Sequence, residues 1–218
     1  MQYQAIVFDM DGVIFDTERL VIEFWKEVAK KHNIPNIEHT CIQCLGTNRV
    51  RTREIFLENY GADFPFDPYC AEVTELFNTH YKGVPLPTKP GIRELLSYLQ
   101  EQDIKVGLAS STAQHLVRDE IGTAGLLPYF QTLVCGDMVE HSKPAPDIFL
   151  KACEILNADP TKSIAIEDSF NGIRSAHCAG MTPIMVPDQV QPTDEIRTLA
   201  FHVMPSLLDV LNWLKTLA

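Results

Sequence analysis

The 218-residue chain lacks the features of a membrane-spanning, secreted or nucleic-acid-binding protein. No apolar stretch approaches the roughly 20 residues needed to span a bilayer, and no basic segment precedes the first apolar run. Positive charge is scarce, because 18 lysines and arginines stand against 29 aspartates and glutamates, for a formal net charge of −11. This balance argues against nucleic acid or an anionic membrane surface as a partner. We expect a cytoplasmic protein.

The six cysteines do not have the spacing of a disulfide scaffold. Cys41 and Cys44 form a single CxxC pair without a second pair, so ordinary thiols are favoured over zinc or redox use. Internal repeats and low-complexity segments are also absent. Hydrophobic residues make up 45% of the chain, which is enough for a sizeable core in one domain or in a domain with a small insertion.

Short apolar runs alternate with helical patterns over most of the sequence. The runs typical of buried strands lie at residues 6–8, 104–109, 132–135, 163–166 and 183–186. Helical periodicity lies between them, at residues 92–102, 112–121, 146–156 and 171–178. This alternation predicts an α/β fold with a parallel sheet covered by helices on both faces. Ligands of such sheets bind at the carboxyl ends of the strands.

One long interval, residues 16–83, breaks this alternation. It contains no convincing strand, and its apolar residues recur at helical spacing. The segment that follows, residues 84–91, is rich in proline and suits a semi-rigid hinge. We therefore expect a small α-helical domain, residues 16–83, inserted directly after the first strand. The main α/β domain would then consist of residues 1–15 and 84–218.

Two aspartates follow the first predicted strand. Asp9 and Asp11 end the apolar run, and Gly12 marks the point at which the strand stops. Asp-Gly alone is a common turn signal. Two carboxylates at the end of a buried strand, however, repel each other in a low dielectric unless a cation joins them. This cost favours a site, in which such a pair can bind a divalent metal, supply a nucleophile and supply an acid or base.

Three further polar segments accompany the predicted strands and helices. Ser110 and Ser111 follow the second strand, Lys143 precedes a helix, and Glu167 and Asp168 follow the fourth strand. Each has a plain alternative: a helix N-cap for the first serine, a solvated surface charge for the lysine, and an acidic first turn for the last two. Together with the aspartates they supply what phosphoryl transfer requires, namely a nucleophile, a metal site, a positive charge and anion-binding helix ends.

Four motifs in this order make the chain resemble the haloacid dehalogenase (HAD) superfamily. Its DxDGxx signature matches residues 8–13, and its other three motifs match Ser110, Lys143 and Glu167-Asp168. The position of the helical insertion resembles the members with a helical cap between the first two motifs. Within these the chain resembles the β-phosphoglucomutase-like phosphatases, through the runs at residues 16–18, 143–147 and 167–172. The resemblance implies a Rossmann-like core, a parallel sheet flanked by helices, and an inserted α-helical cap domain.

The resemblance implies a role for each catalytic residue. Asp9 attacks phosphorus and becomes an aspartyl-phosphate. Asp11 protonates the leaving oxygen and then takes a proton from the hydrolytic water. Ser110 and the backbone amide of Ser111 hold phosphoryl oxygens, and Lys143 neutralises charge on the phosphoryl group and on the nucleophile.

The same resemblance implies Mg²⁺ as the cofactor. Its expected ligands are Asp9, Asp11 through the backbone carbonyl, Asp168 and Glu167. A carboxylate cannot approach a dianionic phosphate unless the metal ion and Lys143 cancel the repulsion. An oxygen-rich site of this kind suits Mg²⁺ better than zinc.

The inserted helices are expected to select the substrate. Gly46 and Arg49 lie where related caps carry a substrate loop, although Arg49 could equally be a solvated residue in an arginine-rich run. Phe24, Trp25 and Phe56 recur at helical spacing and fit the core of the insertion better than stacking on a substrate.

The expected subclass within the superfamily follows from residues that this sequence shares with some members and lacks in comparison with others. Dehalogenases of this fold lack the second aspartate, so Asp11 implies phosphoester substrates. True β-phosphoglucomutases carry a histidine near Val21 and a cap lysine near Asn78, although Lys82 follows a turn later, and both departures favour hydrolysis. We expect a Mg²⁺-dependent phosphatase of small phosphomonoesters, above all sugar phosphates, that acts as a monomer on a small phosphorylated metabolite. A β-phosphoglucomutase-type mutase and a catalytically silent binding protein stay open as alternatives, although no motif residue is lost.

Overall fold

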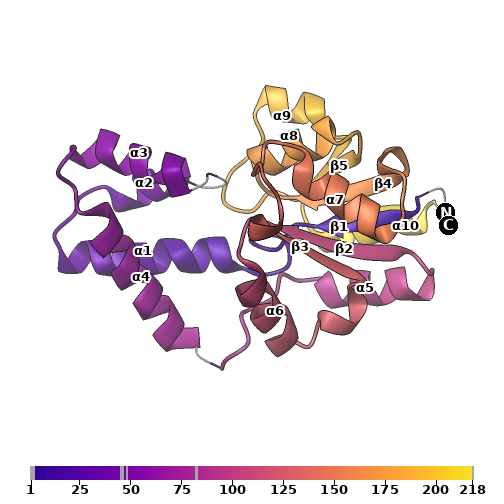
Figure 1. The fold of residues 1–218 in the computed structure, drawn as a ribbon, viewed down its shortest axis with the longest axis horizontal. Coiled ribbons are helices and arrows are strands. Elements are labelled where there is room, and N and C mark those ends of the chain that lie inside the picture. Colours follow the sequence, from indigo (N-terminus) through magenta and orange to yellow (C-terminus); the bar gives the residue numbers. More distant parts are fainter. Residues whose placement is uncertain (1–2, 45–46, 48, 82, 218) are drawn as a thin grey trace.

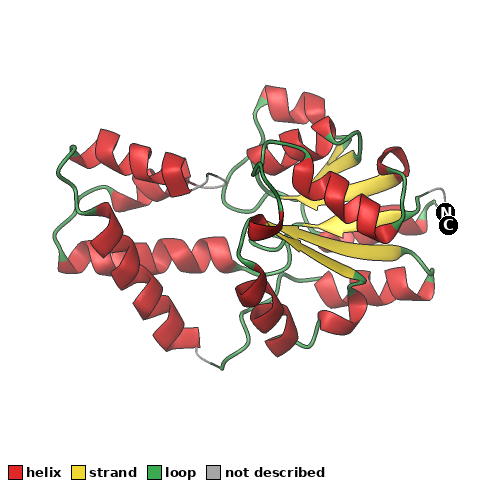
Figure 2. Cartoon of the chain, viewed as in Figure 1, coloured by secondary structure: helices red, strands yellow, loops and turns green. Residues whose placement is uncertain are grey.

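The computed structural model describes residues 3–44, 47, 49–81 and 83–217, and it contains a part with strands and a part made of helices alone (Figure 1). Figure 2 shows that the strands form a single sheet. Its order is β3-β2-β1-β4-β5-β6, and every neighbouring pair is parallel. The strands are β1 Ala5–Phe8, β2 Lys105–Ser110, β3 Thr132–Cys135, β4 Ser163–Glu167, β5 Thr182–Met185 and β6 His202–Val203. The predicted α/β fold with a parallel sheet is confirmed.

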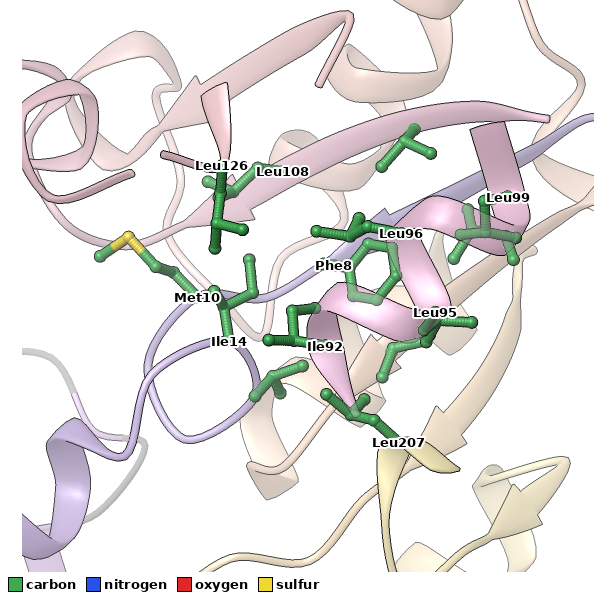
Figure 3. Close-up of a cluster of buried hydrophobic side chains, with 14 of the residues drawn as sticks. Phe8, Met10, Ile14, Ile92, Leu95, Leu96, Leu99, Leu108, Leu126 and Leu207 are labelled. Atoms are coloured by element: carbon green, nitrogen blue, oxygen red, sulfur yellow. The ribbon is translucent and has the colours of Figure 1, made fainter. Parts of the chain in front are cut away.

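Helices cover both faces of the sheet. Each strand contributes to both interfaces, because successive residues of a strand point to opposite faces. Ile6 and Phe8 of β1 pack into a cluster with side chains of α5, α6 and α10 (Figure 3). Ala5 and Val7 pack on the other face, towards α7 and α8. The helices of this part are α5 Ile92–Glu101, α6 Gln114–Thr123, α7 Asp147–Leu156, α8 Phe170–Cys178, α9 Asp194–Leu199 and α10 Leu207–Lys215, with short 3₁₀ turns η1 Leu127–Tyr129, η2 Gly136–Met138 and η3 Pro160–Lys162.

The helical part encloses a core of its own, and within residues 16–83 the described residues form no strand. Phe24 and Phe56 are buried in this core, and the ring of Trp25 lies 4.7 Å from that of Phe56. The prediction that these aromatic residues form the core of the insertion is confirmed. The helices are α1 Thr17–Lys31, α2 Ile37–Cys44, α3 Arg49–Tyr60 and α4 Phe66–Tyr81. We propose a cap domain of residues 16–83 on a core of residues 1–15 and 84–218, in keeping with these separate clusters.

The chain passes between the two parts twice, and the two passages are hydrogen-bonded to each other. The N–H of Asp16 donates to the carbonyl of Pro87 at 2.9 Å, and the N–H of Lys89 donates to the carbonyl of Ile14 at 2.8 Å. The ammonium of Lys89 also lies 2.7 Å from Asp188 Oδ1. The helical part is therefore joined to the sheet by a short paired segment, and the semi-rigid hinge expected there stays a prediction.

The C-terminal region contains elements that the sequence patterns did not predict. β6 has two residues and α9 has six, so neither is long enough to show a clear period. Trp213 of α10 packs on His202 of β6, with ring centroids 5.0 Å apart. Within the described ranges, no helix is both long and apolar enough to cross a membrane.

Candidate active site

Polar residues singled out from the sequence stand where neighbouring strands end. Asp9 directly follows β1, and its N–H donates to the carbonyl of Ile166 in β4 at 2.9 Å. Ser110 is the last residue of β2, and Glu167 is the last residue of β4. Because β1 pairs with both β2 and β4, these three residues meet at one edge of the sheet. The predicted position of the site, at the carboxyl ends of the strands, therefore agrees with the structure.

Lys143 lies at the centre of this group. Its ammonium donates to Asp9 Oδ1 at 2.5 Å, to Glu167 Oε1 at 2.6 Å and to the carbonyl of Ala109 at 2.9 Å. These three bonds use all three protons of the ammonium group. Since the residue is only 9% exposed, its alternative as a solvated surface charge is excluded.

The charges of this buried group are interdependent. Burial alone would lower the pKa of Lys143, but the carboxylates of Asp9 and Glu167 raise it above its usual value, so the lysine stays protonated. Burial raises the pKa of Asp9 well above its usual value, and the ammonium opposes this shift. A cation is therefore what makes a carboxylate tolerable at this position.

Asp11 is held by two hydroxyl groups from different parts of the molecule. Thr17, at the start of α1, donates to Oδ1 at 2.8 Å, and Thr112, just after β2, donates to Oδ2 at 3.2 Å. Desolvation raises the pKa of Asp11, and the two hydroxyls partly offset it. The carboxyl group is thus fixed in orientation where the helical part meets the sheet.

A group of three carboxylates could hold a metal ion. Asp9, Glu167 and Asp168 each offer one oxygen, and these oxygens lie within 4.8 Å of one another. Both oxygens of Glu167 have partners: Oε1 accepts one hydrogen bond, from Lys143, and Oε2 accepts from the backbone N–H groups of Asp168 and Ser169 at 3.1 Å each. Among the described residues, the Asp168 carboxylate has no hydrogen-bond partner. The oxygen-only donor set fits Mg²⁺, and its most available carboxylates are those of Asp9 and Asp168.

Two glycines allow the backbone to approach these acids closely. Gly12 has a φ of 78°, and a Cβ added there would lie 2.2 Å from Asp168 Oδ2. A Cβ on Gly172 would lie 1.8 Å from the carboxyl carbon of Glu167. Any larger residue at either position would displace a carboxylate of the site. The glycines of the first and fourth motifs are therefore part of the site's geometry.

The serines of the second motif have different surroundings. Ser110 is fully buried, and its Oγ accepts a hydrogen bond from the N–H of Thr112 at 3.1 Å. Ser111 and Thr112 line the cavity in front of the sheet edge. The expected helix start at Thr112 lies two residues too early, because α6 begins at Gln114.

A cavity of about 480 Å³ lies between the sheet edge and the helical part. On the sheet side it is lined by Asp9, Asp11, Ser111, Thr112, Gly136, Ser142, Lys143, Asp168 and Ser169, and on the helical side by Thr17, Glu18, Val21, Cys44, Thr47 and Arg49. Arg49 lines the cavity although its side chain is 70% exposed, and its guanidinium donates to Asp67 at 3.0 Å. Gly46 lies outside the described residues, so its role in substrate binding stays a prediction.

Comparison with known proteins identifies the family. The sequence pattern of the haloacid dehalogenase-like hydrolases matches residues 6–186. The chain belongs to this HAD family of hydrolases. It is 33% identical over 181 residues to the phosphorylated carbohydrates phosphatase of Thermotoga maritima, with 83% of each protein covered. It is also 34% identical over 199 residues to the beta-phosphoglucomutase of Bacillus subtilis, with 87% of this chain and 85% of that protein covered.

A solved structure extends the similarity of this HAD hydrolase to three dimensions. CbbY of Rhodobacter sphaeroides in complex with phosphate matches it with a TM-score of 0.74 and 25% identity, over 95% of this chain and 96% of that one. The expected superfamily, the likeness to β-phosphoglucomutase-like proteins and the phosphoric monoester hydrolase class are confirmed by these relatives.

Thr17, Glu18 and Thr112 are among the cavity residues of the HAD hydrolase that were not assigned from the sequence. Thr17 and Glu18 belong to the run Asp16-Thr17-Glu18, which served only as a mark of the family. Thr112 stands directly after the second motif. Their position after a recognised motif is the one signal that could have directed attention to them, because hydrogen bonds across distant segments leave no periodic trace in a sequence.

Proposed function

We propose that this HAD hydrolase removes the phosphoryl group from phosphorylated sugars by way of an aspartyl-phosphate on Asp9, with Mg²⁺ as its cofactor. The observation that carries the proposal is the buried contact of Lys143 with Asp9 and Glu167 beside the cavity. A carboxylate held against an ammonium suits a nucleophile that must approach a phosphate dianion. The phosphorylated carbohydrates phosphatase among the relatives supports the substrate class.

In the first step, a carboxylate oxygen of Asp9 attacks phosphorus. A P–O bond to Asp9 forms, and the P–O bond to the sugar oxygen breaks. The carboxyl group of Asp11 supplies the proton that the leaving alcohol needs. The raised pKa of Asp11 favours the protonated form for this role, and the hydroxyls of Thr17 and Thr112 orient the group.

In the second step, a water molecule attacks the phosphorus of the aspartyl-phosphate. Asp11, now a carboxylate, accepts a proton from that water. The bond between phosphorus and Asp9 breaks, and inorganic phosphate and the free carboxylate are released. The same carboxyl group therefore acts first as an acid and then as a base.

The positive charges of the site lower the repulsion in both steps. Lys143 is placed at Asp9 by its three hydrogen bonds. Asp9, Asp168 and the backbone carbonyl of Asp11 would hold Mg²⁺, which when bound neutralises phosphoryl oxygens. Glu167, which belongs to the same group of three carboxylates, would be a further ligand while it also positions the lysine and the start of α8.

Substrate contacts are proposed on both sides of the cavity. Ser110 and Ser111 would bind phosphoryl oxygens, and the second of these lines the cavity. Arg49 would bind the rest of the substrate from the helical side, together with Gly46. The organic part of the substrate would thus meet the helical part, while its phosphoryl group meets the sheet edge.

A phosphosugar mutase is the second candidate, because the chain is 34% identical to a beta-phosphoglucomutase. Val21 lines the cavity at the position expected of a gating histidine in mutases, and Asn78, near the expected lysine, lies in a neighbouring hollow of the helical part. Lys82, a turn later in the sequence, lies outside the described residues. Both observations favour hydrolysis. With β-glucose 1-phosphate and a bisphosphate primer, the expected main product is inorganic phosphate; glucose 6-phosphate as the main product would establish the mutase.

The nucleophile is tested with Asp9→Asn. Removal of a nucleophile is expected to lower kcat roughly 10⁴-fold or more, measured as Mg²⁺-dependent release of phosphate from p-nitrophenyl phosphate and from a panel of sugar phosphates. The matched control is Asp119→Asn on the exposed surface of α6, which should retain wild-type rates. Substantial turnover by the Asp9 variant, with unchanged circular dichroism, would contradict the mechanism.

A further inference from the structure

The cavity contains a carboxylate that the phosphoryl-transfer residues do not use. Glu18 lies in the first turn of α1 and lines the cavity beside Thr17 and Val21. Its neighbours in sequence are engaged, since Asp16 pairs with Arg19 and Thr17 donates to Asp11. In the part of the chain that the structure describes, Glu18 itself makes no hydrogen bond and no ion pair.

No cation among the described residues of the cavity neutralises this carboxylate. The three ammonium protons of Lys143 are donated to Asp9, Glu167 and the carbonyl of Ala109. The guanidinium of Arg49 pairs with Asp67. Desolvation, followed by repulsion from Asp11, raises the pKa of Glu18 to about 8. An acid placed here is thus disfavoured on its own account, and a phosphate dianion alone would gain nothing from a second negative charge nearby.

Two simpler explanations fit the structure less well. A second metal site would need further ligands, but among the described residues the carboxylates grouped closely enough are Asp9, Glu167 and Asp168, without Glu18. The helix dipole does stabilise an acid in the first turn. An acid on the exposed side of α1 would gain the same stabilisation, so the dipole does not explain a position in the cavity. Glu18 instead faces the cavity, where it is partly removed from water.

We propose that Glu18 is a specificity-determining residue that accepts hydrogen bonds from hydroxyl groups of the substrate. It thereby favours phosphorylated sugars and polyols over phosphoesters without hydroxyls. The proposal rests on the proposed phosphatase function and adds the group that recognises the organic part. The oxygens of a carboxyl group accept hydrogen bonds in its ionised form and, with fewer sites, in its protonated form, and a buried acceptor left unpaired by the wrong ligand penalises that ligand. Hydroxyls close to the phosphoester are the ones within reach, because Glu18 lines the same cavity as Asp11 and directly follows Thr17, which donates to Asp11.

The test uses two substrates that share a six-carbon chain and a primary phosphoester. Sorbitol 6-phosphate carries hydroxyls along the chain, and n-hexyl phosphate carries none. The measured quantity is kcat/KM for sorbitol 6-phosphate divided by kcat/KM for n-hexyl phosphate. This ratio is determined for the wild type and for Glu18→Leu, Glu18→Ala and Glu18→Gln. The matched control is Glu23→Gln, an exposed carboxylate on the same helix whose contact is with Lys26.

The ratio of kcat/KM for sorbitol 6-phosphate to that for n-hexyl phosphate is expected to fall roughly 10- to 100-fold in Glu18→Leu, because a buried polar contact with the sugar hydroxyls is lost. Glu18→Gln should recover part of the ratio, because its amide oxygen still accepts, and Glu23→Gln should leave it unchanged. If Glu18→Leu does not fold, as judged by circular dichroism, Glu18→Ala provides the same comparison.

The outcomes separate this inference from the function on which it rests. A ratio that stays within twofold of the wild type in both truncated variants would falsify the role of Glu18 while leaving the phosphatase intact. Failure of the wild type to hydrolyse p-nitrophenyl phosphate with Mg²⁺ would instead overturn the proposed function itself.

Discussion

The two sides of the cavity are built in opposite ways. On the sheet side, Lys143 and Glu167 are buried and every proton or oxygen of their charged groups is engaged. On the helical side, Arg49 is largely exposed in a surface ion pair, and Glu18 has no partner within the described residues. Preorganised charge suits a reaction that is the same for every phosphoester. Loosely held groups suit the recognition of a variable organic part, so the difference agrees with the proposal that the sheet side performs the chemistry and the helical side selects the substrate.

The sharpest way to break the sheet side is Lys143→Met. It leaves the carboxylates of Asp9 and Glu167 buried without their cation, which is expected to destabilise the protein by about 3–5 kcal/mol. Loss of charge at the phosphoryl group should also lower kcat/KM by roughly 10³-fold. Urea unfolding and steady-state kinetics measure the two effects. Lys162→Met, an exposed lysine of η3, should change neither; a similar loss there would show that the effect is not specific to the site.

The helical side is tested with Arg49→Ala against Arg53→Ala. Both guanidinium groups contact the carboxylate of Asp67, but of the two only Arg49 lines the cavity. Arg49→Ala is expected to raise KM for a sugar phosphate roughly tenfold, equivalent to one lost hydrogen-bonded contact, and to leave kcat nearly unchanged. Stability should change by less than about 1 kcal/mol in both variants, because exposed ion pairs contribute little.

Equal KM values in the two arginine variants would remove Arg49 from the substrate-binding side. A fall in kcat for Arg49→Ala alone would instead place it on the side that performs the chemistry. Either result would change the comparison between the two sides of the cavity.

The last prediction concerns Glu18 and pH. The pKa of Glu18 is raised from 4.5 to about 8 in the folded protein, so its contribution to stability is fully present below 4.5 and is lost as the pH rises through about 8. Glu18→Gln has no such loss. Its melting temperature should match the wild type near about pH 4 and exceed it near about pH 9, by roughly 2–4 °C for each kcal/mol of removed repulsion. A difference independent of pH would point to a cause other than this charge.

Much of the sheet side could be predicted from the sequence. Each central strand is a continuous buried run, so the pattern of apolar residues alone assigns the motif residues at 9, 110 and 167 to strand ends. Parallel pairing of the strands then brings those ends to one edge of the sheet, independently of the conformation of the connecting loops. The resemblance to the HAD superfamily added the order and the roles, and the family is confirmed.

The remainder depends on contacts between distant segments. The expected metal ligand Glu167 also binds Lys143 and the N–H groups of Asp168 and Ser169, and no spacing in the sequence reveals these contacts. Thr17 reaches Asp11 only because α1 starts close to the end of β1. Arg49 is both exposed and part of the cavity lining, so neither of its sequence interpretations alone describes it. β6 was missed because two residues carry no period.

The distribution of tryptophan gives each part of the molecule its own optical reporter. The chain has two tryptophans, Trp25 among the aromatic rings of the helical part and Trp213 against β6 beside the sheet. Replacing either one with phenylalanine leaves a fluorophore that senses one part alone. A pair of single-tryptophan proteins can therefore be followed through the same denaturant titration, and coincident or separated emission curves will tell whether the two parts lose their structure together or in turn.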